Sequence, residues 1–139
     1  MPRDDALLAG LRAKARTVQP RTVALRRAVH RRPELGLDLP TTRDAVLDAL
    51  ADLPLQVHLG RSVTSVVAVL EGARSGPTVL LRGDMDALPL HEDTGLEFAS
   101  EIPGAMHACG HDTHVAMLAS AARVLADHRE DIAGRVLLM

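Results

Sequence analysis

One stretch decides the fold class: Leu80-Leu81-Arg82-Gly83-Asp84-Met85-Asp86-Ala87-Leu88-Pro89. It begins as the end of a continuous apolar run and continues into two carboxylates that stand two residues apart. Ligand sites in open α/β sheets lie at the carboxyl ends of strands, so Asp84 and Asp86 are candidates for such a site. The alternative is that they are polar residues of a loop entry that pair with Arg82 or with a helix end. The pattern predicts an α/β domain.

The segments before and after this stretch in the sequence predict helices. Apolar residues recur at steps of three and four, which is typical of amphipathic helices, and Pro20 suits the first turn of a new helix. Thr41 or Thr42 and Asp112 are suitable N-cap residues. We expect helices over residues 5–18, from Pro20 to Arg31 or Arg32, from Thr41 or Thr42 through Leu50, and from Asp112 to near Gly134.

Other segments predict strands and one long loop. Residues 55–59 alternate between apolar and polar, as in a half-exposed edge strand. Residues 66–70 and 78–81 are continuous apolar runs, which predict two interior strands, and residues 135–139 begin another buried strand. Residues 82–110 are irregular and polar, and a loop of this length is uncommon unless it is functional.

Composition limits the classes of function. A length of 139 residues with 47% hydrophobic content fits one domain, taken as 1–139, and a net charge of −2 gives no reason to expect nucleic acid or an anionic membrane as partner. The chain has one Phe, one Cys, no Trp and no Tyr, so stacking platforms and disulfides are excluded. We see no signal peptide or membrane span, and expect a soluble cytoplasmic protein with a small partner.

The densest group of reactive side chains lies between residues 107 and 114. It comprises His107, Cys109, His111, Asp112 and His114. In an extended loop, residues two apart point the same way, so the first three could converge on one ion, and imidazole and thiolate suit zinc or cobalt. The alternative is a small buried Cys109 beside solvated histidines. We favour the metal site.

Three motifs together resemble the hippurate hydrolase and indole-acetyl-amino-acid hydrolase family of metallo-amidohydrolases. They are His30-Arg31-Arg32-Pro33-Glu34-Leu35-Gly36, the stretch 81–89, and Met106-His107-Ala108-Cys109-Gly110-His111-Asp112. The resemblance runs from about His30 to Met139. Without it, His30 near the end of a helix is better explained by a structural role than by catalysis.

The resemblance implies the N-terminal part of a zinc-peptidase-like catalytic domain, with a mixed, mostly parallel sheet and flanking helices. It implies two divalent ions (Zn, Mn or Co) in the complete site and a substrate that is an N-acyl amino acid or similar small amide. Homo-oligomers are an expectation for the full-length enzyme only. In the family, Cys109 and His111 correspond to metal ligands and Asp86 to the catalytic acidic residue that supports the metal site. Asp84, His107 and His114 are additional candidates.

The resemblance also implies parts that we do not find in these 139 residues: a Glu-Glu pair that supplies the general base and another ligand, and two later histidine ligands. We therefore expect a truncated chain, with no second domain and with little or no turnover alone. In the complete enzyme, activated water would attack the amide carbonyl while a glutamate moves the proton to the leaving amine.

Two rival hypotheses remain open. Cys109 could be a nucleophile activated by His107 or His111, as in thiol hydrolases. The chain could also be a non-catalytic metal-binding or interaction fragment.

Overall fold

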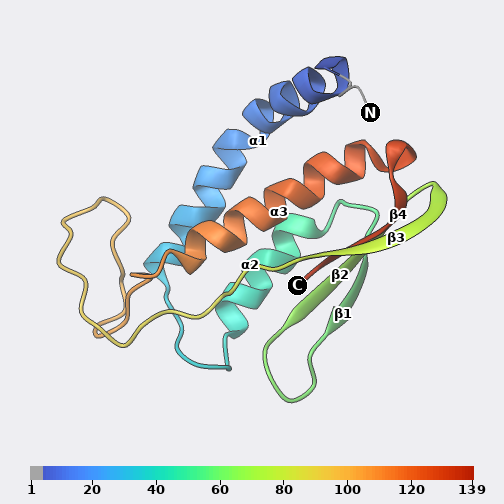
Figure 1. The fold of residues 1–139 in the computed structure, drawn as a ribbon. Helices are drawn as coiled ribbons and strands as arrows, with labels where there is room; N and C mark the ends of the chain where they lie inside the picture. The colour runs from blue at the N-terminus through green and yellow to red at the C-terminus, as the bar shows by residue number, and fades with distance from the viewer. Residues whose placement is uncertain (1–4) are drawn as a thin grey trace.

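The computed structural model describes residues 5–139 as three α-helices against one four-stranded sheet. The elements follow in the order α1 (Asp5–Arg31), α2 (Pro40–Leu50), β1 (Gln56–Leu59), β2 (Val66–Glu71), β3 (Arg74–Leu81), α3 (His111–Asp127), a short 3-10 turn (Arg129–Asp131) and β4 (Ala133–Leu138). Figure 1 shows the helices gathered on one side of the sheet, with the end of α1 beside the start of α3. The predicted α/β class is confirmed.

The sheet is mixed and has the strand order β1-β2-β4-β3. β1 and β4 both run antiparallel to β2, whereas β3 and β4 run parallel. The parallel pair arises because the connection from β3 to β4 passes through α3, and a parallel pair requires such a crossover. Within residues 5–139 the sheet is therefore mixed as predicted, but two of its three strand pairs are antiparallel.

The core lies between this sheet and α2 and α3, and it consists of aliphatic side chains. Small residues of α3 are buried against β2 and β4, and this allows the helix to approach the sheet closely. The buried cluster comprises Leu50, Ala68, Leu70, Ala119, Ala122, Ala126, Val136 and Leu138. No helix within residues 5–139 combines the length and the apolarity that a membrane crossing requires.

α1 is one continuous helix, so the prediction of two helices separated at Pro20 is wrong. Proline removes one backbone hydrogen bond and tends to kink a helix, but packing on neighbouring elements can override this preference. α1 packs along α3, and the Thr22 and Ser120 hydroxyl groups, 2.6 Å apart, connect the two helices. These contacts follow Pro20 by less than one turn.

Glu34 stabilises the start of α2, where a threonine N-cap was predicted. The N-cap position is Leu39, with Pro40 directly after it, and no side chain of the cap residue itself bonds the helix. The Glu34 carboxylate instead accepts hydrogen bonds from the backbone N–H groups of Thr41 (3.0 Å) and Thr42 (2.8 Å). The first-turn N–H groups are satisfied from outside the helix.

The two apolar strands that were predicted as interior differ in position. β2 lies between β1 and β4 and is buried, as predicted. β3 lies at the edge, and Val79 and Leu80 are 50% and 52% exposed. The prediction for residues 78–81 is wrong in this chain, because no segment of residues 5–139 covers the outer edge of β3. The predicted edge strand β1 is confirmed, and all four of its residues are exposed.

Candidate metal centre

The candidate centre lies where β3 ends against the first turn of α3. Asp84 and Asp86 follow the strand, at the carboxyl end of the parallel pair. A Cβ atom added at Gly83 would lie 3.1 Å from the carbonyl oxygen of His114 and 3.2 Å from Cδ2 of Leu118. The missing side chain at Gly83 therefore lets the strand end lie directly on the helix.

Three side chains from these two segments form a compact group of potential ligands. Asp84, His111 and His114 each offer one ligand atom, and these atoms all lie within 4.8 Å of one another. The two histidines are three residues apart in the first turn of α3, so they share one face, and their ring centroids are 5.5 Å apart. Within residues 5–139 this is the one group of three or more His, Cys, Asp or Glu side chains with such spacing.

Asp86 sets the orientation of the His111 ring. Nδ1 of His111 lies 2.9 Å from the backbone oxygen of Asp86 and 3.0 Å from its Oδ1. Since both neighbours are acceptors, Nδ1 carries the hydrogen and donates it, which leaves the lone pair of the neutral ring on Nε2. Such a partner fixes both the tautomer and the ring position of a ligating histidine.

Arg82 keeps Asp84 ionised. The guanidinium donates to Oδ1 of Asp84 from Nε (2.8 Å) and Nη2 (2.6 Å). The Arg82 hydrogen bonds hold the pKa of Asp84 below its usual range, and the neighbouring His111 and His114 act in the same direction. Asp84 therefore fits both the loop-entry and the ligand-site interpretation, because it pairs with Arg82 and also belongs to the ligand group.

These donors fit a divalent cation of the zinc, manganese or cobalt type. Two imidazole nitrogens and one carboxylate oxygen are ligands that such ions accept. A cation of this type polarises a carbonyl group and makes water more acidic. The residues that would hold it are Asp84, His111 and His114, with Asp86 behind His111.

A mainly apolar cavity of about 490 Å³ opens beside the same carboxylates. Asp84 and Asp86 contribute to its lining together with their neighbours in the 82–86 segment. The other lining residues come from α2, α3, the start of β2, the end of β4 and the segments before α2 and β2. A volume of this size is typical of small-molecule sites.

The segment from His107 to Gly110 is a turn and not an extended run. The N–H of Gly110 donates to the carbonyl oxygen of His107 (3.2 Å), and Gly110 has a φ of 81°. The expected alternation of side chains therefore fails, and His107, Cys109 and His111 point to different surroundings. The structure places Cys109 at the surface, outside the compact ligand group.

His107 lies in the interior, 4% exposed, with its ring centroid 6.2 Å from that of His30. Neither of its ring nitrogens has a hydrogen-bond partner within residues 5–139. Burial lowers the pKa of His107, because the charged ring loses its hydration. A metal ligand or a base for Cys109 would need a lone pair directed at the site, and the position of His107 favours neither role.

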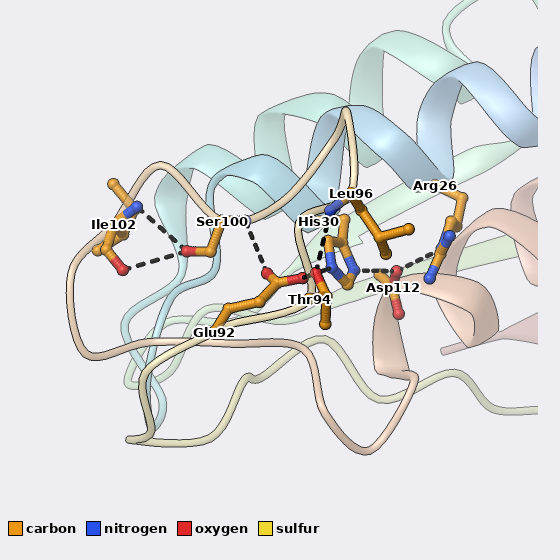
Figure 2. A network of polar contacts seen from close by, with 8 residues as sticks. All are labelled: Arg26, His30, Glu92, Thr94, Leu96, Ser100, Ile102 and Asp112. Carbon is orange, nitrogen blue, oxygen red and sulfur yellow. Dashed lines mark hydrogen bonds and ion pairs between the residues drawn. The ribbon is translucent and has the colours of Figure 1, made fainter.

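Asp112 does not cap α3 as predicted. Gly110 occupies the N-cap position and Asp112 lies in the first turn, completely buried, where Oδ2 accepts hydrogen bonds from Arg26 and His30. Figure 2 shows this cluster, which continues from His30 to Glu92 in the long loop. The structural role predicted for His30 agrees with this placement.

Sequence reasoning did not single out Arg26 or Glu92. Arg26 lies four residues before His30 on α1, so the two share a helix face, and this spacing was a usable signal. Glu92 belongs to an irregular loop whose sequence has no period, and only the folded arrangement brings it to His30.

The three motifs of the sequence meet at the centre. The N–H of Ala87 donates to the carbonyl oxygen of Glu34 (2.8 Å), so the first motif contacts the second. Asp86 joins the second to the third through His111, and His30 joins the first to the third through Asp112. The long loop at residues 82–110 is confirmed, and it provides Asp86 and Ala87 for two of these three connections.

Known proteins resemble the chain over most of its length. It is 41% identical over 134 residues to Thermostable carboxypeptidase 1 of Saccharolobus solfataricus, which covers 96% of this chain and 34% of that protein. It is 42% identical over 120 residues to an N-acyl-L-amino acid amidohydrolase of Geobacillus stearothermophilus, covering 86% of this chain and 32% of that protein. The chain thus spans about one third of the length of these relatives.

A solved structure shares the fold. The YXEP protein of Bacillus subtilis, a dinuclear metal binding peptidase from the M20 family, superposes with a TM-score of 0.84 and 34% identity, covering 88% of this chain and 35% of that chain. Residues 80–139, which include β3, the ligand group and α3, match the family described as Peptidase family M20/M25/M40. Residues 80–139 are therefore similar to Peptidase family M20/M25/M40, and the relatives that the chain matches have the names of a carboxypeptidase and an amidohydrolase.

Proposed function

We propose that this chain provides part of the cation site of a metal-dependent hydrolase that cleaves the amide bond of N-acyl amino acids or similar small amides. The observation that supports it best is the group of Asp84, His111 and His114, whose ligand atoms lie within 4.8 Å of one another. The names of the relatives support the reaction class, and the adjacent cavity has a size suited to a small molecule.

The residues of this chain have separate tasks in the proposal. His111 and His114 offer imidazole nitrogens, and Asp84 offers a carboxylate that Arg82 holds ionised. Asp86 keeps the hydrogen of His111 on Nδ1, so that Nε2 faces the cation. A bound cation supplies Lewis-acid polarisation of the scissile carbonyl group.

Cys109 remains a proposed further ligand. Its thiol lies at the surface two residues before His111, and a movement of the 107–110 turn could bring it to the group. Cobalt(II) tests this directly, because a thiolate ligand adds an intense charge-transfer band. We expect the band in the wild-type chain and its loss in Cys109→Ser, with the other cobalt bands retained.

Titration with Zn²⁺ or Co²⁺ tests the ligand group. We expect the dissociation constant to rise at least ~10-fold in His111→Ala and in His114→Ala, because each change removes a donor. His91→Ala, in an exposed part of the long loop, is the matched control and should bind as the wild-type chain does. Equal affinity in all four proteins would remove the basis of the proposal.

Hydrolysis of hippurate-type substrates separates the proposal from the thiol mechanism. The described ligand group holds one carboxylate and two imidazoles and no glutamate, so we expect the 139-residue chain to show little turnover. Any turnover should disappear with a chelator and return with divalent cation. Turnover that resists the chelator but is lost on alkylation of Cys109 would favour the thiol mechanism.

A further inference from the structure

A buried charged cluster lies directly behind the candidate metal centre and is not part of the ligand group. It comprises Arg26 and His30 of α1, Asp112 of α3 and Glu92 of the long loop (Figure 2). Asp112 is 0% exposed and His30 is 3% exposed. Charged groups are rarely this buried, so the arrangement requires a physical explanation.

Asp112 is the centre of the cluster. Its Oδ2 accepts a hydrogen bond from Nε of Arg26 at 2.6 Å and one from Nδ1 of His30 at 2.7 Å. A buried carboxylate without partners would cost several kcal/mol, and these two donors offset that cost. Both donors belong to α1, so the start of α3 has a fixed position relative to α1.

The cluster also holds the long loop. Nε2 of His30 lies 3.2 Å from Oε1 of Glu92, and Glu92 accepts hydrogen bonds from the Thr94 hydroxyl (2.6 Å) and the Ser100 N–H (2.7 Å). Burial raises the pKa of Glu92, but these hydrogen bonds outweigh burial and hold its pKa below the usual range. Both ring nitrogens of His30 thus face carboxylate oxygens, one from α3 and one from the loop.

The only aromatic residue outside the histidines reinforces this attachment. The ring of Phe98 in the loop lies under the guanidinium groups of Arg26 (4.7 Å) and Arg27 (4.9 Å), and its centroid is 5.4 Å from that of His30. Cation–π contacts and an edge-on ring contact therefore add to the hydrogen bonds at the same place.

The position of Asp112 in the helix explains what the cluster does. Successive side chains of an α-helix are about 100° apart. His111 and His114 face Asp84 and Asp86, while Asp112, between them in sequence, faces α1. Holding Asp112 therefore fixes the rotation of the first turn of α3, and with it the directions of both imidazoles.

Resting on the proposed function, we propose that His30 and Arg26 are positioning residues, which act through Asp112 to set the geometry of the cation site, while Glu92 attaches the long loop to His30. Buried ion pairs contribute little net stability compared with apolar packing, and a role in specifying one arrangement is consistent with that balance. The cluster touches no ligand atom of the group, so its effect on the site is indirect.

Two substitutions at His30 separate its two contacts. The side-chain amide of His30→Asn can place a donor where Nδ1 was and retain the bond to Asp112. The amide of His30→Gln reaches the position of Nε2 and retains the bond to Glu92. We expect His30→Asn to bind Co²⁺ within about threefold of the wild-type chain and His30→Gln to bind at least ~10-fold more weakly, with shifted visible bands.

Asp112→Asn is the direct variant, and Asp52→Asn is its matched control. Asp52 accepts two hydrogen bonds from Arg123 (2.6 and 2.8 Å), and this pair joins the turn after α2 to α3 away from the centre. Both substitutions weaken one arginine–carboxylate pair, so both lower stability. Only Asp112→Asn should weaken cobalt binding and change the cobalt spectrum. If Asp112 only stabilised the fold, the two variants would not differ in this way.

Amide hydrogen exchange of the metal-free chain provides a second readout. The N–H groups of Thr113 and His114 both donate to the carbonyl oxygen of Gly110. We expect their exchange to accelerate in Asp112→Asn and His30→Gln and to stay unchanged in Asp52→Asn and His30→Asn. A wild-type chain that binds no cobalt would contradict the proposed function and leave the exchange result to decide the positioning role.

The proposal is overturned if folded His30→Gln or Asp112→Asn binds cobalt with wild-type affinity and spectrum and also shows wild-type exchange at Thr113 and His114. It is equally overturned if Asp52→Asn weakens cobalt binding as much as Asp112→Asn does. If Asp112→Asn does not fold, the pair of His30 variants decides.

Discussion

At the scale of single residues, the contact between Asp86 and His111 links the strand end to the helix through one hydrogen. Nδ1 of His111 donates to two oxygen atoms of Asp86, and the ring can then present Nε2 to a cation in only one orientation. The sequence identified both residues through their motifs. Their pairing could not be predicted, because they lie 25 positions apart in the sequence, across an irregular loop.

Replacing Asp86 tests this coupling. In Asp86→Ala the side-chain acceptor for Nδ1 is lost, and we expect the cation affinity to fall by about 10–100-fold, the usual effect of removing a partner of a ligating histidine. Isothermal titration with Zn²⁺ measures it. The exposed Asp93 is the matched control, and a similar loss in Asp93→Ala would show that net charge, and not orientation, explains the effect.

Gly83 provides a second test at this scale. A methyl group there would lie 3.1–3.3 Å from atoms of His114 and Leu118, so the strand end must move from the helix. We expect Gly83→Ala to lower the free energy of unfolding by about 1–3 kcal/mol and to weaken Zn²⁺ binding by separating Asp84 from His114.

Chemical denaturation and zinc titration measure these two effects, and Gly10→Ala is the control. Gly10 lies in α1 with nothing within 4 Å of the added Cβ, so its change should stabilise the helix by about 0.5–1 kcal/mol. Unchanged zinc binding in Gly83→Ala would show that the close approach at Gly83 does not position the group.

At the scale of elements, α2 depends on a residue outside it. Glu34 accepts hydrogen bonds from the N–H groups of Thr41 and Thr42 and from the Thr42 hydroxyl group. Burial raises the pKa of Glu34, but the hydrogen bonds outweigh burial and the pKa lies below its usual value. The carboxylate is therefore more strongly favoured in the folded chain than in the unfolded chain.

Glu34→Gln should lower the free energy of unfolding by about 1 kcal/mol at pH 7, as expected for weakening a helix cap. Because the pKa of Glu34 is lower in the folded chain, its ionised carboxylate stabilises the fold at pH values above the unfolded pKa of about 4.3. This stabilisation is lost as the pH falls through the folded pKa. The unfolding free energies of wild type and variant should therefore approach one another as the pH falls below about 4.3 and coincide only below the folded pKa. A constant difference down to pH 2, or an equal effect from exposed Glu97→Gln, would contradict this explanation.

The elements themselves were largely predictable, and the errors have specific causes. Periodicity identified α2, α3 and the amphipathic pattern of α1, but propensity at Pro20 was overridden by packing on α3. The apolar run of residues 78–81 correctly predicted a strand. It did not predict the edge position of that strand, because composition does not tell which segment lies beside a strand.

At the scale of the whole molecule, the fold gathers three distant motifs around one edge of the sheet. Figure 1 shows the long loop carrying the chain from the end of β3 to the junction of α1 and α3. The motifs predicted which segments surround the site. Which side chains form the ligand group depended on a turn at residues 107–110 and on the rotation of α3. Those two features place His107 inside and bring Asp84 and His114 to His111.

The central claim is that these three side chains hold one cation, and anomalous diffraction from crystals of the chain grown with Zn²⁺ tests it most directly. We predict an anomalous peak at the zinc edge within bonding distance of Asp84, His111 and His114. A peak elsewhere, or none at this position with zinc in excess, would contradict the account.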